Sequence, residues 1–310
     1  TGWTPSSDIV NALEPVAPST QQALFAYGTF GGTNWVNVKN PVSATGVVSA
    51  DATGVGTARR NVSACGIGGD KAIFGLGYNG SLTSITNLVD NSGVVSADVA
   101  GVASTREIAA GLTYGLDKGI FCFAGNTGSG KTGVSNLISS SGVVASDTAA
   151  VATAKDAGND AGLTYGLDKG IVAYGVTSGV TNTKNLISNV GVVGSDQSGV
   201  GTARSSVSAT SYSGNNLGIF AFGDGPLTNT NLISNTGVQA SDSSTAASAK
   251  YAGAAAPYGG DKALFCYGHN GSGFINTRNL ISNTGSTASN VSGAGTARYQ
   301  LSGAGFSYSA

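Results

Sequence analysis

The sequence consists almost entirely of six similar copies of one segment, and this repetition restricts the possible folds more than any other feature. The copies follow one another with a period of 45 to 51 residues. They begin near Ala23, Lys71, Lys118, Lys169, Leu217 and Lys262. Repeats of such a length form stacked arrays or propellers, in which each copy is one small supersecondary unit.

Each copy contains four short runs that are typical of β-strands. An apolar run such as KAIFGLG is followed by TNLIS-like and TGVVSAD-like runs, and then by a run that follows Thr-Ala-Arg. Turn-forming residues bound the runs, and GGDK or GLDK joins one copy to the next. The composition, with 49 glycines, 40% apolar and only 10% charged residues, fits a turn-rich β protein. We therefore predict an all-β chain.

The two ends of the repeat region are complementary. The first copy has no preceding strand of the Thr-Ala-Arg type, whereas the last copy is followed by one, at about Thr296 to Tyr308. Pairing this C-terminal strand with the N-terminal strands would complete a sheet and remove exposed edges. The prediction is a six-bladed β-propeller of four-stranded blades over residues 21–310, closed in this way. Residues 1–20 are predicted to be an arm or linker.

One segment matches the phosphate-binding motif G-x-x-x-x-G-K-[ST], with Gly125, Gly130, Lys131 and Thr132 in the fixed positions. This motif binds phosphate only where a strand precedes it and a helix follows it. Here Gly125 is expected to end a strand, as Gly77 does one copy earlier, and the chain then enters the strand-like run SNLIS. We therefore expect no nucleotide site and no cofactor.

Two charge patterns recur in the copies. Each copy has a basic residue before its last run and, eight positions earlier, an acidic residue that Asn290 replaces once. These residues are Arg59, Arg106, Lys155, Arg204, Lys250 and Arg298, and Asp51, Asp98, Asp147, Asp196 and Asp242. The fixed spacing favours a structural ring of ion pairs, within blades or between them, over a ring of cations that holds an anion. Asp70, Asp117, Asp168 and Asp261, each followed by Lys, are interpreted as turn residues.

Few ionisable residues remain outside these two patterns, which argues against an enzyme. His269 is the only histidine, so a metal site with two histidines is excluded. Asp156 and Asp160 lie close in the sequence but lack further oxygen ligands for a cation. The formal net charge of −1 gives no basis for nucleic-acid binding, and no apolar run is long enough for membrane insertion. The three cysteines are expected in the core.

A loop of variable length follows the apolar run of each copy and carries several aromatic residues. Exposed aromatic side chains on loops are suited to contacts with sugars or partner proteins. The candidate ligand-binding residues are Trp35, Tyr78, His269 and Phe274.

The strand ends FAYG, FAFG and FCYG, each followed by a variable loop and by TAR or TAK, resemble the kelch-type propeller. The recurring NLISNTGVV and GVGTAR also resemble repeats in virion proteins of tailed phages, particularly marine and cyanobacterial ones. These resemblances imply a non-catalytic structural or adhesive module of an extracellular virion, such as a fibre, receptor-binding or decoration protein. Its N-terminal arm would bind other virion proteins.

The alternative function is that of a lectin propeller that binds cell-surface glycan. Two enzymatic propellers are disfavoured by the sequence. A kelch-like copper oxidase needs more histidine ligands than one, and the sialidase pattern S-x-D-x-G-x-T-W is not present in its full form.

Overall fold

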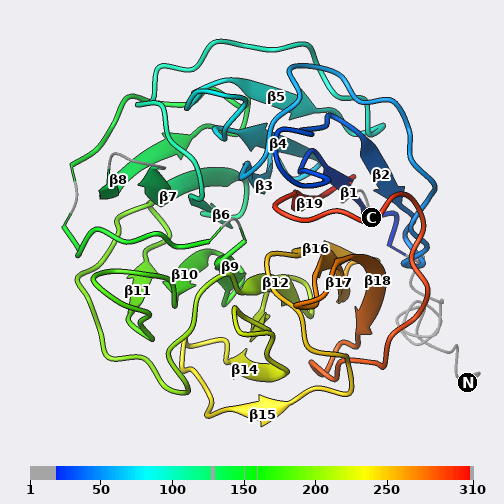
Figure 1. Cartoon of the computed structure of the whole chain (residues 1–310). Helices are drawn as coiled ribbons and strands as arrows, with labels where there is room; N and C mark the ends of the chain where they lie inside the picture. Colours follow the sequence, from blue (N-terminus) through cyan, green and yellow to red (C-terminus); the bar gives the residue numbers. More distant parts are fainter. Residues whose placement is uncertain (1–18, 127–129, 150, 159, 308–310) are drawn as a thin grey trace, which may run out of the picture.

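The computed structural model describes residues 19–126, 130–149, 151–158 and 160–307. This part of the chain contains strands and no helix, which confirms the all-β prediction. The strands form six small antiparallel sheets that follow one another around a common centre (Figure 1). Among the described residues, no helix has the length and apolar character needed to cross a bilayer.

Each sheet has an inner, a middle and an outer strand. Five sheets contain these strands in chain order. They are β3 (Ser63–Ile67), β4 (Lys71–Gly75) and β5 (Thr86–Val89); β6 (Ala110–Tyr114), β7 (Lys118–Asn126) and β8 (Gly130–Ile138); β9 (Gly162–Tyr165), β10 (Lys169–Ala173) and β11 (Lys184–Ile187); β12 (Ser208–Tyr212), β13 (Leu217–Ala221), β14 (Asn229–Ile233) and the added β15 (Ser243–Ser244); and β16 (Ala254–Tyr258), β17 (Lys262–His269) and β18 (Phe274–Ile281).

The sixth sheet joins the two ends of the described chain, and we call it the closing sheet. Its order is β19 (Ser302–Phe306), β1 (Gln22–Ala26) and β2 (Lys39–Val42). Strand β19 pairs antiparallel with β1, with Gln22 opposite Phe306 and Ala26 opposite Ser302. The C-terminal strand therefore pairs with the N-terminal strands, as the sequence predicts, although it is shorter than the predicted segment.

The strand predicted for the TGVVSAD-like run of each copy is mostly absent as a continuous strand. In the described residues, the TGVVSAD-like segments are attached by isolated bridges such as Lys39↔Ala52 and Val42↔Val48, and only β15 is a short strand. Between the two bridges the side chain of Asn40 bonds the carbonyl of Ser49, at 3.1 Å. The N–H of Ser49 also donates to the carbonyl of Pro41 at 2.8 Å, so a side-chain bond supplements a short backbone ladder here.

Backbone hydrogen bonds link each sheet to the next at the end where the Asp-Lys turns lie. The N–H groups of Gly68, Gly115, Gly166, Ser213, Gly259 and Ser307 donate to the carbonyls of Asp117, Asp168, Asn216, Asp261, Gln21 and Asp70, respectively. The link from Gly259 leads into the closing sheet and the link from Ser307 leads out of it. The circle of bonds is therefore complete, and the inner strands contact one another in the same cyclic order.

The core lies between neighbouring sheets and is built from the middle strands. Phe25, Phe74 and Phe121 are fully buried, because the middle strands are covered on both faces. This explains why their sequences are continuously apolar rather than alternating. The three cysteines are buried and free, in agreement with their expected place in the core.

The segment with the phosphate-binding pattern forms the hairpin of β7 and β8. The prediction that Gly125 ends its strand is wrong, because β7 continues to Asn126 and Lys131 pairs with Gly125 across the hairpin. Ala124 occupies the place that Gly77 has in the preceding copy, next to a residue with positive φ. No helix follows Lys131 in the described chain, so the feature that gives the motif its phosphate affinity is not present there.

Candidate functional site

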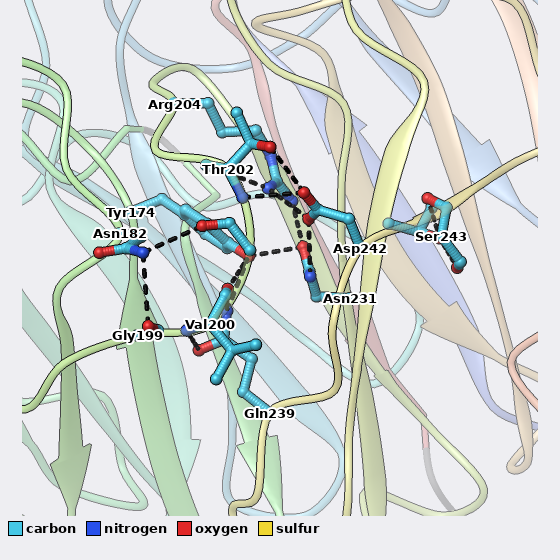
Figure 2. Close-up of polar contacts among 12 residues, drawn as sticks. Tyr174, Asn182, Gly199, Val200, Thr202, Arg204, Asn231, Gln239, Asp242 and Ser243 are labelled. Carbon is cyan, nitrogen blue, oxygen red and sulfur yellow. Dashed lines mark hydrogen bonds and ion pairs between the residues drawn. The ribbon is translucent and has the colours of Figure 1, made fainter.

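The recurring cations lie in a polar network, which Figure 2 shows for Arg204. Its Nη2 donates to Asn231 Oδ1 at 2.7 Å, and Asn231 Nδ2 donates to Asp242 Oδ1 at 2.9 Å. The backbone N–H and hydroxyl of Thr202 donate to the other carboxylate oxygen, at 2.8 and 2.7 Å. Arg204 and Asp242 are 3.6 Å apart, so Asn231 is the direct link between them.

The same network occurs in every sheet, and the asparagine is its invariant member. In each sheet the cation donates to the asparagine, which donates to the acidic residue or to Asn290. The asparagines are Asn40, Asn87, Asn136, Asn185, Asn231 and Asn279, all fully buried. The sequence reasoning missed them, although each stands 11 residues before its acidic partner.

The acidic residue does not pair with the cation eight positions after it. It lies in the same sheet as the inner strand that follows the cation of the preceding copy. The polar network is therefore within one sheet. Asp51 therefore bonds Thr296 and lies 3.8 Å from Arg298, which joins the two chain ends inside the closing sheet.

Contact with the neighbouring sheet comes from aromatic rings. Arg59 lies over Tyr27, Arg204 over Tyr174 and Arg298 over Tyr267, with guanidinium-to-centroid distances of 4.1, 3.9 and 4.4 Å. Lys155 and Lys250 lie over phenylalanine rings, and Leu76 replaces the aromatic residue beside Arg106. The six cations are between 0% and 2% exposed, so they cannot hold an anion from solution.

Hydrogen bonds in this network lower the pKa of four of its carboxylates. Burial alone would raise the pKa of Asp242, but hydrogen bonds from Thr202 and Asn231 outweigh burial and bring its pKa to about 2. The pKa values of Asp51, Asp98 and Asp196 are lowered by the same combination of threonine and asparagine bonds. The network is therefore a charged structural element at neutral pH.

The position that follows each cation differs strongly between copies. It lies at the end of the molecule opposite the Asp-Lys turns, where the variable loops also lie. The six residues are Arg60, Glu107, Asp156, Ser205, Tyr251 and Tyr299. The copies agree where the network holds the sheets together and diverge one residue later, at positions that are half-buried or buried.

The aromatic residues of this end gather on three neighbouring sheets. We call this group the aromatic sector, and it consists of Trp35, Tyr78, Tyr251, His269, Phe274 and Tyr299. All six are half-buried. The structure thus brings all four predicted candidates into one region and adds Tyr251 and Tyr299, which the sequence reasoning missed because it did not compare the residues that follow the cations.

Ring contacts divide the aromatic sector into two connected halves. Trp35 packs edge-on against Tyr78, with 5.5 Å between centroids. Phe274 stacks on Tyr299 at 4.9 Å with an interplanar angle of 17°, and His269 packs against both rings. Thr29 bridges to both Tyr299 and Trp35 in the backbone, which places the two halves side by side.

Arg60 lies beside the aromatic sector and differs from the repeated cations. Its guanidinium lies 5.1 Å from the centroid of Tyr78, and Nη1 donates to Gln300 Oε1 over 3.4 Å. No carboxylate of the described residues lies within ion-pair distance of it. Gln300 also lines a polar cavity of about 60 Å³ at this end of the axis.

Two acidic residues also lie at this end of the molecule, and one of them, Asp156, lines the same cavity. Glu107 is fully buried and accepts a bond from Asn61 Nδ2 at 2.7 Å. Burial raises the pKa of Asp156, and the nearby charge of Glu107 adds to this effect, against the lowering effects of the Gly158 N–H and Lys131. Asp156 and Gln300 thus line the same cavity.

Asp160 lies inside the ring of inner strands. Strand β9 begins seven residues after Lys155, whereas the other inner strands begin four residues after their cations, and Asp160 stands in this longer connection. Its carboxylate accepts bonds from the hydroxyl of Ser302 in β19 and from the N–H of Ala255 in β16. Burial raises its pKa to about 7, although the Ser302, Ala255 and Gly303 bonds oppose this. Asp156 and Asp160 thus have separate surroundings.

No protein-family model matches this chain, and no curated protein matches it either. Among the described residues, no three His, Cys, Asp or Glu side chains gather as a metal site would require. The candidate site therefore rests on the aromatic sector and on Arg60.

Proposed function

We propose that the chain is a six-bladed, kelch-like β-propeller that acts as a non-catalytic adhesive module. The complete circle of backbone hydrogen bonds and the shared closing sheet support this architecture. The recurring charges are used inside the sheets, which supports a binding role over a catalytic one. The resemblance of the repeats to those of phage virion proteins supports a role on an extracellular particle, to which the N-terminal segment, outside the described residues, would attach the module through other virion proteins.

One observation carries the adhesive function. The six copies are alike in the network that holds the sheets and unlike on one end, where the differences produce the aromatic sector. Half-buried aromatic side chains offer contact area at a small cost in conformational entropy, and they are common at binding sites. A lectin that binds glycans is the second candidate, and the same aromatic sector favours it.

The test is binding of the full chain to a broad glycan array and to intact bacterial cells. We expect binding to either target, and we expect Phe274→Ala to lower it at least tenfold. Leu116→Ala is the matched control, because Leu116 is 66% exposed at the end with the Asp-Lys turns. Equal losses in both variants, or no binding to any target, would contradict the proposal.

A further inference from the structure

We propose that the aromatic sector and Arg60 form a site for a sugar that carries a carboxylate, such as a uronic or a sialic acid. This inference rests on the proposed adhesive function and gives its ligand class. Three properties of the described residues support it: ring faces, hydrogen-bond donors and one unpaired charge.

The ring faces come from the stacked pair Phe274 and Tyr299. Their small interplanar angle makes them one aromatic block with parallel faces. The C–H faces of a pyranose pack on such a surface, as other apolar faces do. Gly31 lies close to Phe274, because a Cβ added at Gly31 would come within 2.9 Å of ring atom Cζ, so the ring packs against the backbone of the first copy's loop.

Hydrogen-bond donors surround this block. His269 Nδ1 accepts the N–H of Gly271 at 2.9 Å, which in the neutral ring leaves Nε2 to carry the proton and to donate. The hydroxyls of Tyr78, Tyr251 and Tyr299 make no hydrogen bond to other described residues. Sugar hydroxyls both donate and accept, so they can satisfy these groups.

The charge comes from Arg60. Each repeated cation bonds a buried asparagine, and the turn lysines pair with their neighbouring aspartates at 2.7 to 3.0 Å. Arg60 has only the long bond to Gln300, which leaves Nη2 free of described partners. A guanidinium held against a ring prefers a planar anion, and a carboxylate is the anion that sugars commonly carry. A neutral sugar would leave this charge uncompensated.

The test compares each acidic sugar with a neutral counterpart of the same ring structure. Polygalacturonate is compared with its fully methyl-esterified form, and sialyllactose with its methyl ester, so that the two arms distinguish uronic from sialic acids. Binding to the full chain is measured by titration calorimetry at low and high salt. We expect at least one acidic ligand to bind tenfold more tightly than its neutral counterpart, and added salt to weaken it.

Variants assign the effect to Arg60. Arg60→Gln should abolish the preference for the acidic ligand while leaving weak binding through the rings. Arg278→Gln is the matched control, because this half-buried arginine lies near Tyr258 at the other end. Equal binding of acidic and neutral ligands, an unchanged preference in Arg60→Gln, or no binding of any of the four ligands would overturn the inference. If acidic and neutral ligands bind equally and Phe274→Ala weakens the binding of both, the inference about the carboxylate is wrong but the adhesive function is supported.

Discussion

Lys250 differs from the other repeated cations in the residue behind its asparagine. Its Nζ donates to Asn279 at 2.8 Å, and Asn279 donates to Asn290, where the other sheets have a carboxylate. Burial lowers the pKa of Lys250 to about 8, and it lowers the pKa of Lys155, which has Asp196 behind its asparagine, to about 8 as well. The sheet that Lys250 enters is thus the one whose buried cation has no carboxylate behind its asparagine.

Replacing Asn290 by Asp should stabilise the protein at pH 7 by on the order of 1 kcal/mol, because the new carboxylate would attract the buried ammonium of Lys250 through Asn279. In the parent, the folded pKa of Lys250 lies below its ordinary value of 10.5, so stability should rise between pH 8 and pH 10.5. In Asn290→Asp this rise in stability should begin at a higher pH, because the carboxylate would raise the folded pKa of Lys250. Urea unfolding at pH 7 and pH 9.5 measures both effects.

The reverse change, Asp242→Asn, is the matched control. It removes the carboxylate behind Asn231 and should lower the free energy of unfolding at pH 7. A gain in stability from Asp242→Asn, or a loss from Asn290→Asp, would contradict the role given to the network.

At the scale of the element, an unusual backbone conformation directly follows four of the middle strands and lies at a bulge within β7 and β17. Tyr27, Leu76, Phe123, Tyr174, Phe222 and Tyr267 all have positive φ angles between 57° and 68°. Such angles are unfavourable for large side chains. Here they hold a ring or Leu76 beside the cation of the next sheet. Sequence patterns predict the strands but not this turn, because aromatic residues give no signal for positive φ.

Replacing Gly175 by Ala should lower the free energy of unfolding by at least about 2 kcal/mol. Gly175 has a φ of 109°, and an added Cβ would lie 2.1 Å from the carbonyl oxygen of Asp156. Gly179→Ala, in the loop of the same copy, meets no atom within 4 Å and should change stability by no more than about 0.5 kcal/mol. Equal midpoints of the two variants in urea would contradict this account.

At the scale of the whole molecule, the repeats predicted the β segments and the pairing of the two ends, because both follow from comparing copies. Asp160 could not be found in this way. It occurs in one copy, and its partners Ser302 and Ala255 come close only when the inner strands surround one centre. Arg60 was missed for a related reason, since its importance depends on the absence of an acidic neighbour in space.

Asp160 should make stability depend on pH. Its folded pKa of about 7 lies above the ordinary value of 3.8, so the folded state keeps a proton that the unfolded state releases. Stability should therefore fall as pH rises from about 4 to 7, with a slope approaching about 1.4 kcal/mol per pH unit. Asp160→Asn, which mimics the protonated form, should remove this slope.

Urea unfolding of the parent and of Asp160→Asn across this pH range gives the slope as a difference, which cancels the contributions of other groups. Asp117→Asn, at an exposed turn, is the control and should run parallel to the parent. Parallel curves for Asp160→Asn as well would contradict a protonated carboxyl at the centre.

The closing sheet also determines how the molecule responds to force. Gln22 lies opposite Phe306, and the hydroxyl of Thr20 bonds the carbonyl of Ser307, so the outer ends of β1 and β19 lie together. Tension applied between these two ends peels their hydrogen bonds apart one after another, whereas tension along a strand must break them at once. Attachment by one end of the chain puts no tension on the pairing of β1 with β19, whereas a tether through both ends would pull these two strands apart.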